Sequence, residues 1–135
     1  MTCLLLIKKF KIMRNLLKIV FIIFILAGCT NNNTSVNNIL KYKGTYTGND
    51  ITYNGSVIEA TATITVEESG KVTLEIRRDN ETLNFYADAD FIKELSSTKF
   101  EVNSLGQYLS LDFSNGLYFI FNQGKGNYSG NLTKQ

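Results

Sequence analysis

The chain has 135 residues, which is enough for one folded domain. It contains no His, no Pro and no Trp, and it has two Cys. Without His there is no Ser-His-Asp triad, no Cys-His pair and no His-ligated zinc or haem, and two cysteines cannot make a four-thiolate metal site. We therefore expect a protein that is not an enzyme and that holds no metal.

The charge is distributed unevenly along the chain. Five of the 14 basic residues lie before residue 29, where no acidic residue occurs, so the remainder carries nine bases and 12 acids. A mildly acidic domain is a poor partner for nucleic acid, because neutralisation of phosphates by Lys and Arg dominates that kind of binding. We expect no nucleic-acid partner.

Residues 1–28 have the pattern of a secretory signal peptide. Basic residues precede the apolar run Ile19–Leu26, and small residues follow it. The run has eight residues, whereas a membrane-spanning helix needs about 20, so we do not expect a permanent membrane span. Met13 followed by Arg14 would begin a more compact leader, which makes Met13 a second candidate for the true start.

The apolar run ends in Leu26-Ala27-Gly28-Cys29, which resembles the lipobox of bacterial lipoproteins. The resemblance implies that the Cys29 thiol carries a diacylglycerol and that cleavage before Cys29 makes it the mature N-terminus. Two acyl chains hold a protein at a membrane, where one chain does so only transiently. Apart from this lipid we expect no cofactor. The alternative interpretation is an uncleaved signal anchor.

The same resemblance implies that the mature chain lies in the cell envelope, anchored to a membrane. In bacteria with two membranes, a residue other than Asp after the modified cysteine favours the outer membrane, and here that residue is Thr30. Residues 29–38 then form the lipidated N-terminus and a polar, flexible tether, with Val36 as the apolar exception in 30–38. The folded domain is expected at 39–135.

Residues 39–135 have the alternating pattern of an all-β domain. Val57–Val66 carries apolar residues on one face, and a tight turn joins it to Val72–Arg77; Thr82–Ala87 continues the meander. The residues expected to point inward from these three strands are Ile58, Ala60, Ala62, Ile64, Val66, Val72, Leu74, Ile76, Leu83 and Phe85.

The segment Asp88–Ser97 interrupts this alternation. A short helix near residues 90–96, capped by Asp90, fits the pattern. Asp88, Asp90 and Glu94 form the one acidic cluster of the chain. Helix capping explains them better than calcium binding, because they lack the glycine and the number of oxygen ligands of a calcium loop.

Five further strands complete the expected fold: Tyr42–Gly48, Lys99–Asn103, Tyr108–Phe113, Leu117–Phe121 and Gly126–Thr133. About eight strands predict a small antiparallel up-and-down β-barrel, with a two-sheet β-sandwich as the alternative. The first and last strands read alike, with Gly44–Gly48 against Asn127–Asn131. Pairing these two strands would close the barrel and remove both sheet edges.

The Gly-x-Tyr-x-Gly opening at Gly44–Gly48 and the Tyr-x-Gly-x-Leu return at Tyr128–Leu132 resemble the small lipocalin-like (calycin-like) β-barrel lipoproteins of bacteria. Tyr46 stands where true lipocalins carry the Trp of Gly-x-Trp. An eight-stranded barrel is either filled by side chains or holds one small ligand. A filled core is one alternative here. The other is a pocket for a small apolar ligand near Ala60 and Ala62, the small inward residues.

The strand Leu117–Phe121 is apolar on both faces. If its odd-numbered residues fill the core, Tyr118 and Ile120 face outward, where they must be either covered by another segment of the chain or part of a binding surface. The apolar residues of the 91–95 segment could cover them; alternatively, the two side chains form an interface with a protein partner.

Together these predictions describe a lipid-anchored cell-envelope lipoprotein whose domain binds a ligand without catalysis. A structural or interaction subunit of an envelope assembly is one alternative, and an inhibitor of a hydrolase is another.

Overall fold

The computed structural model describes residues 38–124 and 126–135. Its elements, in chain order, are η1 Asn38–Tyr42, β1 Gly44–Tyr53, β2 Ser56–Val66, β3 Val72–Arg78, β4 Glu81–Ala87, η2 Ala89–Phe91, β5 Ile92–Glu94, β6 Lys99–Ser104, β7 Gln107–Asp112, β8 Leu117–Gln123 and β9 Gly126–Lys134. The predicted signal peptide, the lipobox with Cys29 and the tether up to residue 37 lie outside the described residues. The last residue assigned to the tether, Asn38, lies in η1, and its side-chain amide donates to both carboxylate oxygens of Glu94 at 2.8 and 3.0 Å.

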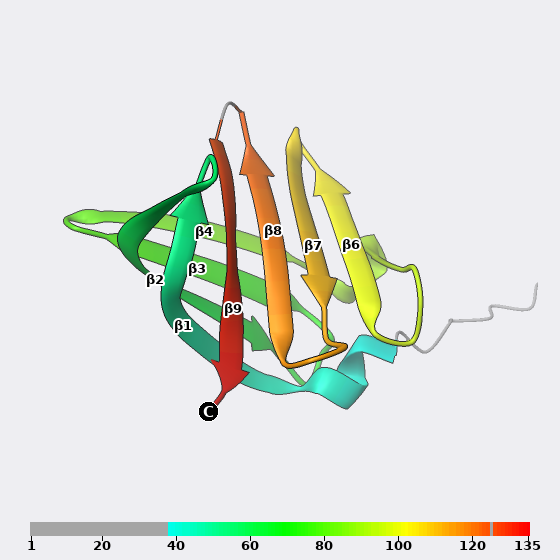
Figure 1. Ribbon diagram of the computed structural model, residues 1–135. Coiled ribbons are helices and arrows are strands. Elements are labelled where there is room, and N and C mark those ends of the chain that lie inside the picture. The colour runs from blue at the N-terminus through cyan, green and yellow to red at the C-terminus, as the bar shows by residue number, and fades with distance from the viewer. Residues whose placement is uncertain (1–37, 125) are drawn as a thin grey trace, which may run out of the picture. The chain divides into compact units, whose positions relative to one another are not determined.

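The nine strands form one antiparallel sheet in the order β4-β3-β2-β1-β9-β8-β7-β6-β5 (Figure 1). Two up-and-down meanders, β1–β4 and β5–β9, are joined where β1 pairs with β9. In Figure 1 the sheet curls so that the green strands β2, β3 and β4 lie behind β9 and β8. The result is a nearly closed barrel, so the predicted all-β barrel is confirmed.

The predicted pairing of the first and last strands is also confirmed, but the expectation that it removes both edges is wrong. The sheet still has two edge strands, β4 and β5, which stand at the two ends of the strand order. β4 cannot continue into a hairpin, because the chain after Ala87 turns through η2, and β5 has only three residues, which pair with β6. A seam therefore opens the barrel between β4 and β5.

The core lies inside the barrel and follows from the period of two along each strand. Alternate residues of β2 and β3 are buried, and the two strands pair in register from Thr61–Arg77 to Val66–Val72. The largest fully buried side chains come from strands on both sides of the barrel: Phe100, Phe119, Phe121, Ile51, Ile64, Leu74, Leu109, Leu111, Leu117, Leu132 and Val66, with Ile39 of η1. The inward residues predicted for β2, β3 and β4 are confirmed as buried or half-buried.

Glycines bring β1 and β9 together at a register shift. The register of β1 shifts against β2 between Gly48 and Asp50, and against β9 between Thr47 and Ile51. A Cβ on Gly48 would collide with the carbonyl oxygen of Asn131, and a Cβ on Gly130 would lie 2.8 Å from the carbonyl oxygen of Asp50. The similar glycine motifs of the two strands therefore allow a close backbone approach at the bulge.

One end of the barrel is closed by η1. Ile39 is fully buried, and the ring of Tyr42 stacks on Phe113 with centroids 4.1 Å apart. Tyr46 is buried beside them and its hydroxyl donates to the backbone carbonyl of Tyr42 at 2.8 Å. Burial raises the pKa of Tyr46 above its ordinary value, with Tyr42 as a second cause.

Two local predictions are corrected by the structure. The helix expected near residues 90–96 is wrong: the chain forms the three-residue 3-10 turn η2 and then β5, which is the strand missing from the expected eight. The first strand extends to Tyr53 rather than ending at Gly48. It turns at Asn54-Gly55, where φ is +49° and +82°, the conformation that a two-residue hairpin requires.

Candidate functional site

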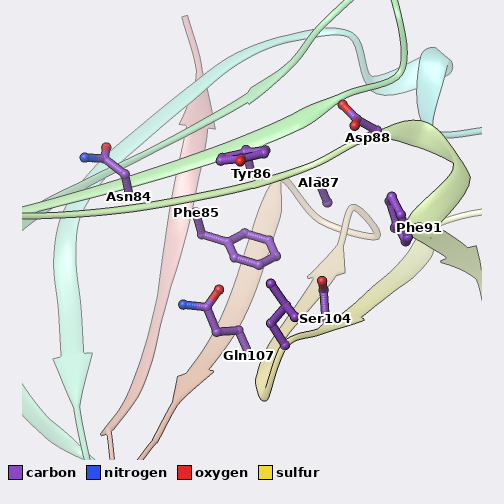
Figure 2. A pocket seen from close by; sticks show the side chains of 9 residues that line it. Asn84, Phe85, Tyr86, Ala87, Asp88, Phe91, Ser104 and Gln107 are labelled. Carbon is purple, nitrogen blue, oxygen red and sulfur yellow. The ribbon is translucent and has the colours of Figure 1, made fainter.

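A pocket of about 200 Å³ lies at the seam of the barrel, between β4 and the turn that joins β6 to β7 (Figure 2). Its lining residues are Asn84, Phe85, Tyr86, Ala87, Asp88, Phe91, Ser104, Leu105 and Gln107. We call it the seam pocket. Figure 2 shows the Phe85 ring directed from β4 towards the side chains of Ser104 and Gln107.

The seam pocket follows the edge of β4 rather than one of its faces. Five consecutive residues, 84–88, line it. Because successive side chains of a strand point to opposite faces, a cavity on one face would be lined by alternate residues only. The edge of β4, with its backbone amide and carbonyl groups, is therefore part of the pocket wall.

The inner end of the pocket is apolar and rests on the barrel core. Phe85 and Ala87 are buried. The Phe85 ring lies 5.2 Å, centroid to centroid, from the ring of Phe121 on β8, so the two rings bridge the barrel interior. This contact gives the pocket a firm floor, because Phe121 is fully buried.

The rim of the pocket gathers exposed apolar side chains. Phe91 is 62% exposed, Tyr86 is 69% exposed and Leu105 is 100% exposed. The ammonium group of Lys71 lies 5.2 Å above the ring of Tyr86 and covers part of it. Three of the seven large apolar side chains that the described residues expose thus lie around one opening. Such clustering is typical of a binding surface rather than of scattered surface residues.

Leu105 is also placed in an unfavourable backbone conformation. Its φ is +51°, in the left-handed region where a Cβ is crowded. Two other tight turns of the domain place Asn54 and Asp79 at φ +49° and +50°, and these residue types tolerate the region. Leu105 therefore contributes nothing to the stability of the domain that would explain a leucine at this position.

The polar groups of the seam pocket are mostly neutral. Asn84, Ser104 and Gln107 supply amide and hydroxyl groups, and Asp88 supplies one carboxylate. Among the described residues, no Lys or Arg lines the pocket. The lining residues themselves therefore favour apolar, uncharged or basic groups, and Lys71 lies beside the rim at Tyr86.

The acidic cluster near the pocket does not form a cap or a metal site in the described part of the chain. Asp88, rather than Asp90, is the N-cap of η2, and it makes no side-chain capping bond. Glu94 instead accepts from Asn38. No group of three or more metal-ligating side chains occurs within residues 38–124 and 126–135.

A second opening, of about 350 Å³, lies along the other half of β4. It is lined by Ile76, Arg78, Glu81, Thr82, Leu83 and Tyr128. Tyr128 lies 4.7 Å from Tyr53, ring to ring, at this end of the barrel. Burial raises the pKa of Tyr128 above its ordinary value, with Tyr53 a smaller cause. Because its lining comes from β3, β4 and β9, this opening does not belong to the seam.

The residues predicted to line a pocket, Ala60 and Ala62, lie elsewhere. Both are buried on the inner face of β2, and Ala62 pairs with Gly48. Ala60 borders a wide, shallow depression with Val57 and Arg77. Neither alanine contributes to the seam pocket.

The residues predicted to form an interface lie on the outer face of β8. Tyr118 is 40% exposed and Ile120 is half-buried. The expectation that the 91–95 segment covers them is wrong, because β7 and β6 separate β5 from β8 in the sheet. Ile92 also packs into the core instead.

No pattern in the sequence predicted the seam pocket as such. Its strongest available signal was Leu105-Gly106, a two-residue turn between strands with Leu where Asn or Asp is usual. Within the described residues, no helix is both long and apolar enough to cross a membrane. Comparison of the chain with protein-family models, with curated proteins and with solved structures finds no match to any of them.

Proposed function

We propose that the chain is a lipid-anchored lipoprotein of the bacterial cell envelope, and that its barrel is a non-catalytic binding domain. The anchor is supported by the order of basic residues, apolar run and Leu26-Ala27-Gly28-Cys29 in the leader. The binding role is supported by the seam pocket. A two-chain lipid at Cys29 would keep the domain at the membrane surface.

The observation that carries the binding role is the placement of Leu105. Its side chain is wholly exposed and its φ is +51°, so both hydration and backbone conformation disfavour it in the free domain. A ligand seated in the seam pocket would cover this side chain together with Phe91. The unfavourable features of the free domain would then be offset on binding.

The anchor is tested by metabolic labelling with a fatty acid. Wild-type protein is expected to be labelled, and Cys29→Ser is expected to be unlabelled. Labelling that survives the substitution would contradict the anchor.

The binding role is tested with N-phenyl-1-naphthylamine, a neutral apolar fluorescent probe. The chain from residue 29, expressed with Cys29→Ser to keep it free of lipid, is expected to bind the probe saturably. Leu105→Asn is expected to weaken this binding at least fivefold, because it removes the apolar side chain from the rim. Val57→Asn, at an exposed apolar residue outside the seam pocket, is the matched control. Equal binding by Leu105→Asn and wild type would contradict the site.

A second candidate function, a subunit that associates through β8, is favoured by the exposed ring of Tyr118 beside Ile120. Tyr118→Ser combined with Ile120→Ser would abolish self-association or partner capture if this face is used. Unchanged association in the double variant would eliminate this candidate.

A further inference from the structure

We infer that the seam of the barrel binds one extended peptide segment, which adds to the free edge of β4 as a further strand. This inference rests on the proposed binding role of the seam pocket and names the class of ligand. It follows from the edge of β4, from the second wall of the seam and from the charge of Asp88 at one end of it.

The edge of β4 lacks the features that usually protect an edge strand. β4 is seven residues long, pairs with β3 alone among the described strands, and keeps an unbroken register over its length. It has no Pro and no Lys or Arg, and its one charged residue, Glu81, stands at its beginning. Long, flat, uncharged edges are templates for a further strand.

The other edge of the sheet is protected by comparison. β5 has three residues, and two of them, Lys93 and Glu94, are exposed and charged. Lys93 also bonds Glu101 of β6 at 3.0 Å, and Glu94 accepts from Asn38. Of the two edges at the seam, β4 is therefore the one available for pairing.

The backbone of β4 borders the seam pocket over its second half, residues 84–87. In an antiparallel pair, alternate residues exchange both backbone bonds with the partner strand, and the residues between them direct both groups away from it. The seam pocket borders residues 84–88, whereas the opening at residues 81–83 is otherwise lined by β3 and β9. An entering backbone would thus meet unpaired amide and carbonyl groups at every second residue of the second half of β4.

The second wall of the seam limits what can enter. Ser104 and Gln107 of the β6–β7 hairpin stand opposite β4 across the seam pocket (Figure 2), and Leu105 of the same hairpin also lines it. The proposed segment would lie between these two walls. The edge of another folded sheet would bring its own neighbouring strands against the hairpin, so a second copy of the barrel fits this slot poorly.

The lining predicts the character of the segment. Side chains that point inward from the added strand would meet Phe85, Ala87 and Phe91, so they should be apolar. The carboxylate of Asp88 stands at one end without a Lys or Arg among the described lining residues. Charge complementarity therefore favours a basic residue at that end. This combination of backbone pairing and alternate side-chain pockets is a known mode of peptide recognition.

The test uses the native lipidated protein in lipid nanodiscs, with empty nanodiscs as the blank. The probe is a dye-labelled heptapeptide that begins with Lys and continues with alternating Val and Thr, and binding is read as fluorescence anisotropy. Two further versions carry N-methyl groups on alternate amides, one on the odd and one on the even positions. A peptide with Glu in place of Lys tests the charge.

The inference predicts saturable binding of the parent peptide. One N-methylated version should bind at least tenfold more weakly and the other about as well as the parent, because only one set of amides faces β4. The Glu version should bind severalfold more weakly. Leu105→Asn in the protein should weaken binding of the parent peptide, while Val57→Asn should leave it unchanged.

No saturable binding, or equal binding of the parent and both methylated peptides, would overturn the inference. If the naphthylamine probe still depends on Leu105 in that case, the binding site stands and only the peptide ligand is wrong. If the probe is also insensitive to Leu105→Asn, the proposed binding role fails as well. A peptide-free dimer that disappears in Leu105→Asn would assign the seam to a second copy, and would also overturn the inference.

Discussion

Leu105 occupies the same turn position as Asn54, with φ of +51° against +49°, yet it carries the side chain least suited to that position. Both residues precede a glycine in a two-residue hairpin turn. Asn54 also accepts from the backbone amide of Asn127 through its side-chain oxygen, whereas the Leu105 side chain is wholly in solvent. The two turns therefore share one backbone conformation but differ in side chain: Asn54 suits the conformation, whereas Leu105 does not and instead lines the seam pocket.

Leu105→Asn is expected to stabilise the free domain by about 1 kcal/mol, because the left-handed region costs an ordinary L-residue about 1–2 kcal/mol and Asn tolerates it better. Urea unfolding of the chain with Cys29→Ser measures this. The reverse change, Asn54→Leu, should destabilise by about the same amount or more, since it also removes a hydrogen bond. A Leu105→Asn variant that is less stable than wild type would contradict this reading of the turn.

Gly48→Ala tests the close approach of β1 and β9. The new methyl group would meet the carbonyl oxygen of Asn131 and lie 2.9 Å from Leu132 Cδ2. We expect a loss of about 1–3 kcal/mol in the free energy of unfolding, the usual cost of overpacking. Thr47→Ala, on the neighbouring residue of β1, is the control and should cost much less. Equal stability of Gly48→Ala and wild type would mean that the two strands do not approach as described.

The carboxylate of Asp112 should make the stability of the domain depend on pH in the acid range. Hydrogen bonds from the Ser114 hydroxyl and backbone amide, and then Lys99 at 3.2 Å, hold the pKa of Asp112 below its ordinary value. A lowered pKa in the folded state contributes stability above the unfolded pKa, and this contribution is lost as the pH falls through the folded pKa. The side chain is partly exposed, so we expect less than about 1 kcal/mol.

Asp112→Asn should therefore lower the stability at neutral pH, with the difference from wild type shrinking progressively as the pH falls below about 4. Urea unfolding at several pH values measures this, with Glu59→Gln on the exposed face of β2 as the control. A difference that stays constant down to pH 2 would rule out the carboxylate as its cause.

Ionisation of the buried Tyr46 hydroxyl should lower the stability of the domain at high pH. Its pKa is raised, so the neutral hydroxyl is favoured in the folded state. The corresponding stability is present below the ordinary tyrosine pKa of about 10 and is lost as the pH rises above it. Titration at 295 nm should show a late-titrating tyrosine that Tyr46→Phe removes. The substitution should also cost about 0.5–1.5 kcal/mol through the lost bond to Tyr42. An unchanged titration curve would contradict this assignment.

The sequence predicts the strands well where one face is buried. The alternation in Val57–Val66 and Val72–Arg77 identifies both β2 and β3 and the residues that they bury, because a period of two admits one inward set. The likeness of Gly44–Gly48 to Asn127–Asn131 indicated the pairing of β1 with β9. Its physical basis, a backbone approach that excludes a Cβ, becomes visible only in the structure.

The seam was not predictable in the same way. Its position depends on how the segment after Ala87 turns, and the apolar residues there fit a helix face as well as the observed η2 and β5. The pocket also combines β4 with the β6–β7 turn, which are separated in the chain and meet only when the sheet curls. A local pattern carries no information about such a meeting, although the leucine in the turn was itself a visible anomaly.

The open edge of β4 is tested most directly by amide hydrogen exchange followed by NMR in the free protein. If the edge is open, amides of alternate residues between Thr82 and Ala87 exchange fast, while those between them and the amides of β1 and β9 exchange slowly. Equally slow exchange at every residue of β4 would show that the seam is closed by backbone pairing, and would contradict the account of the binding site.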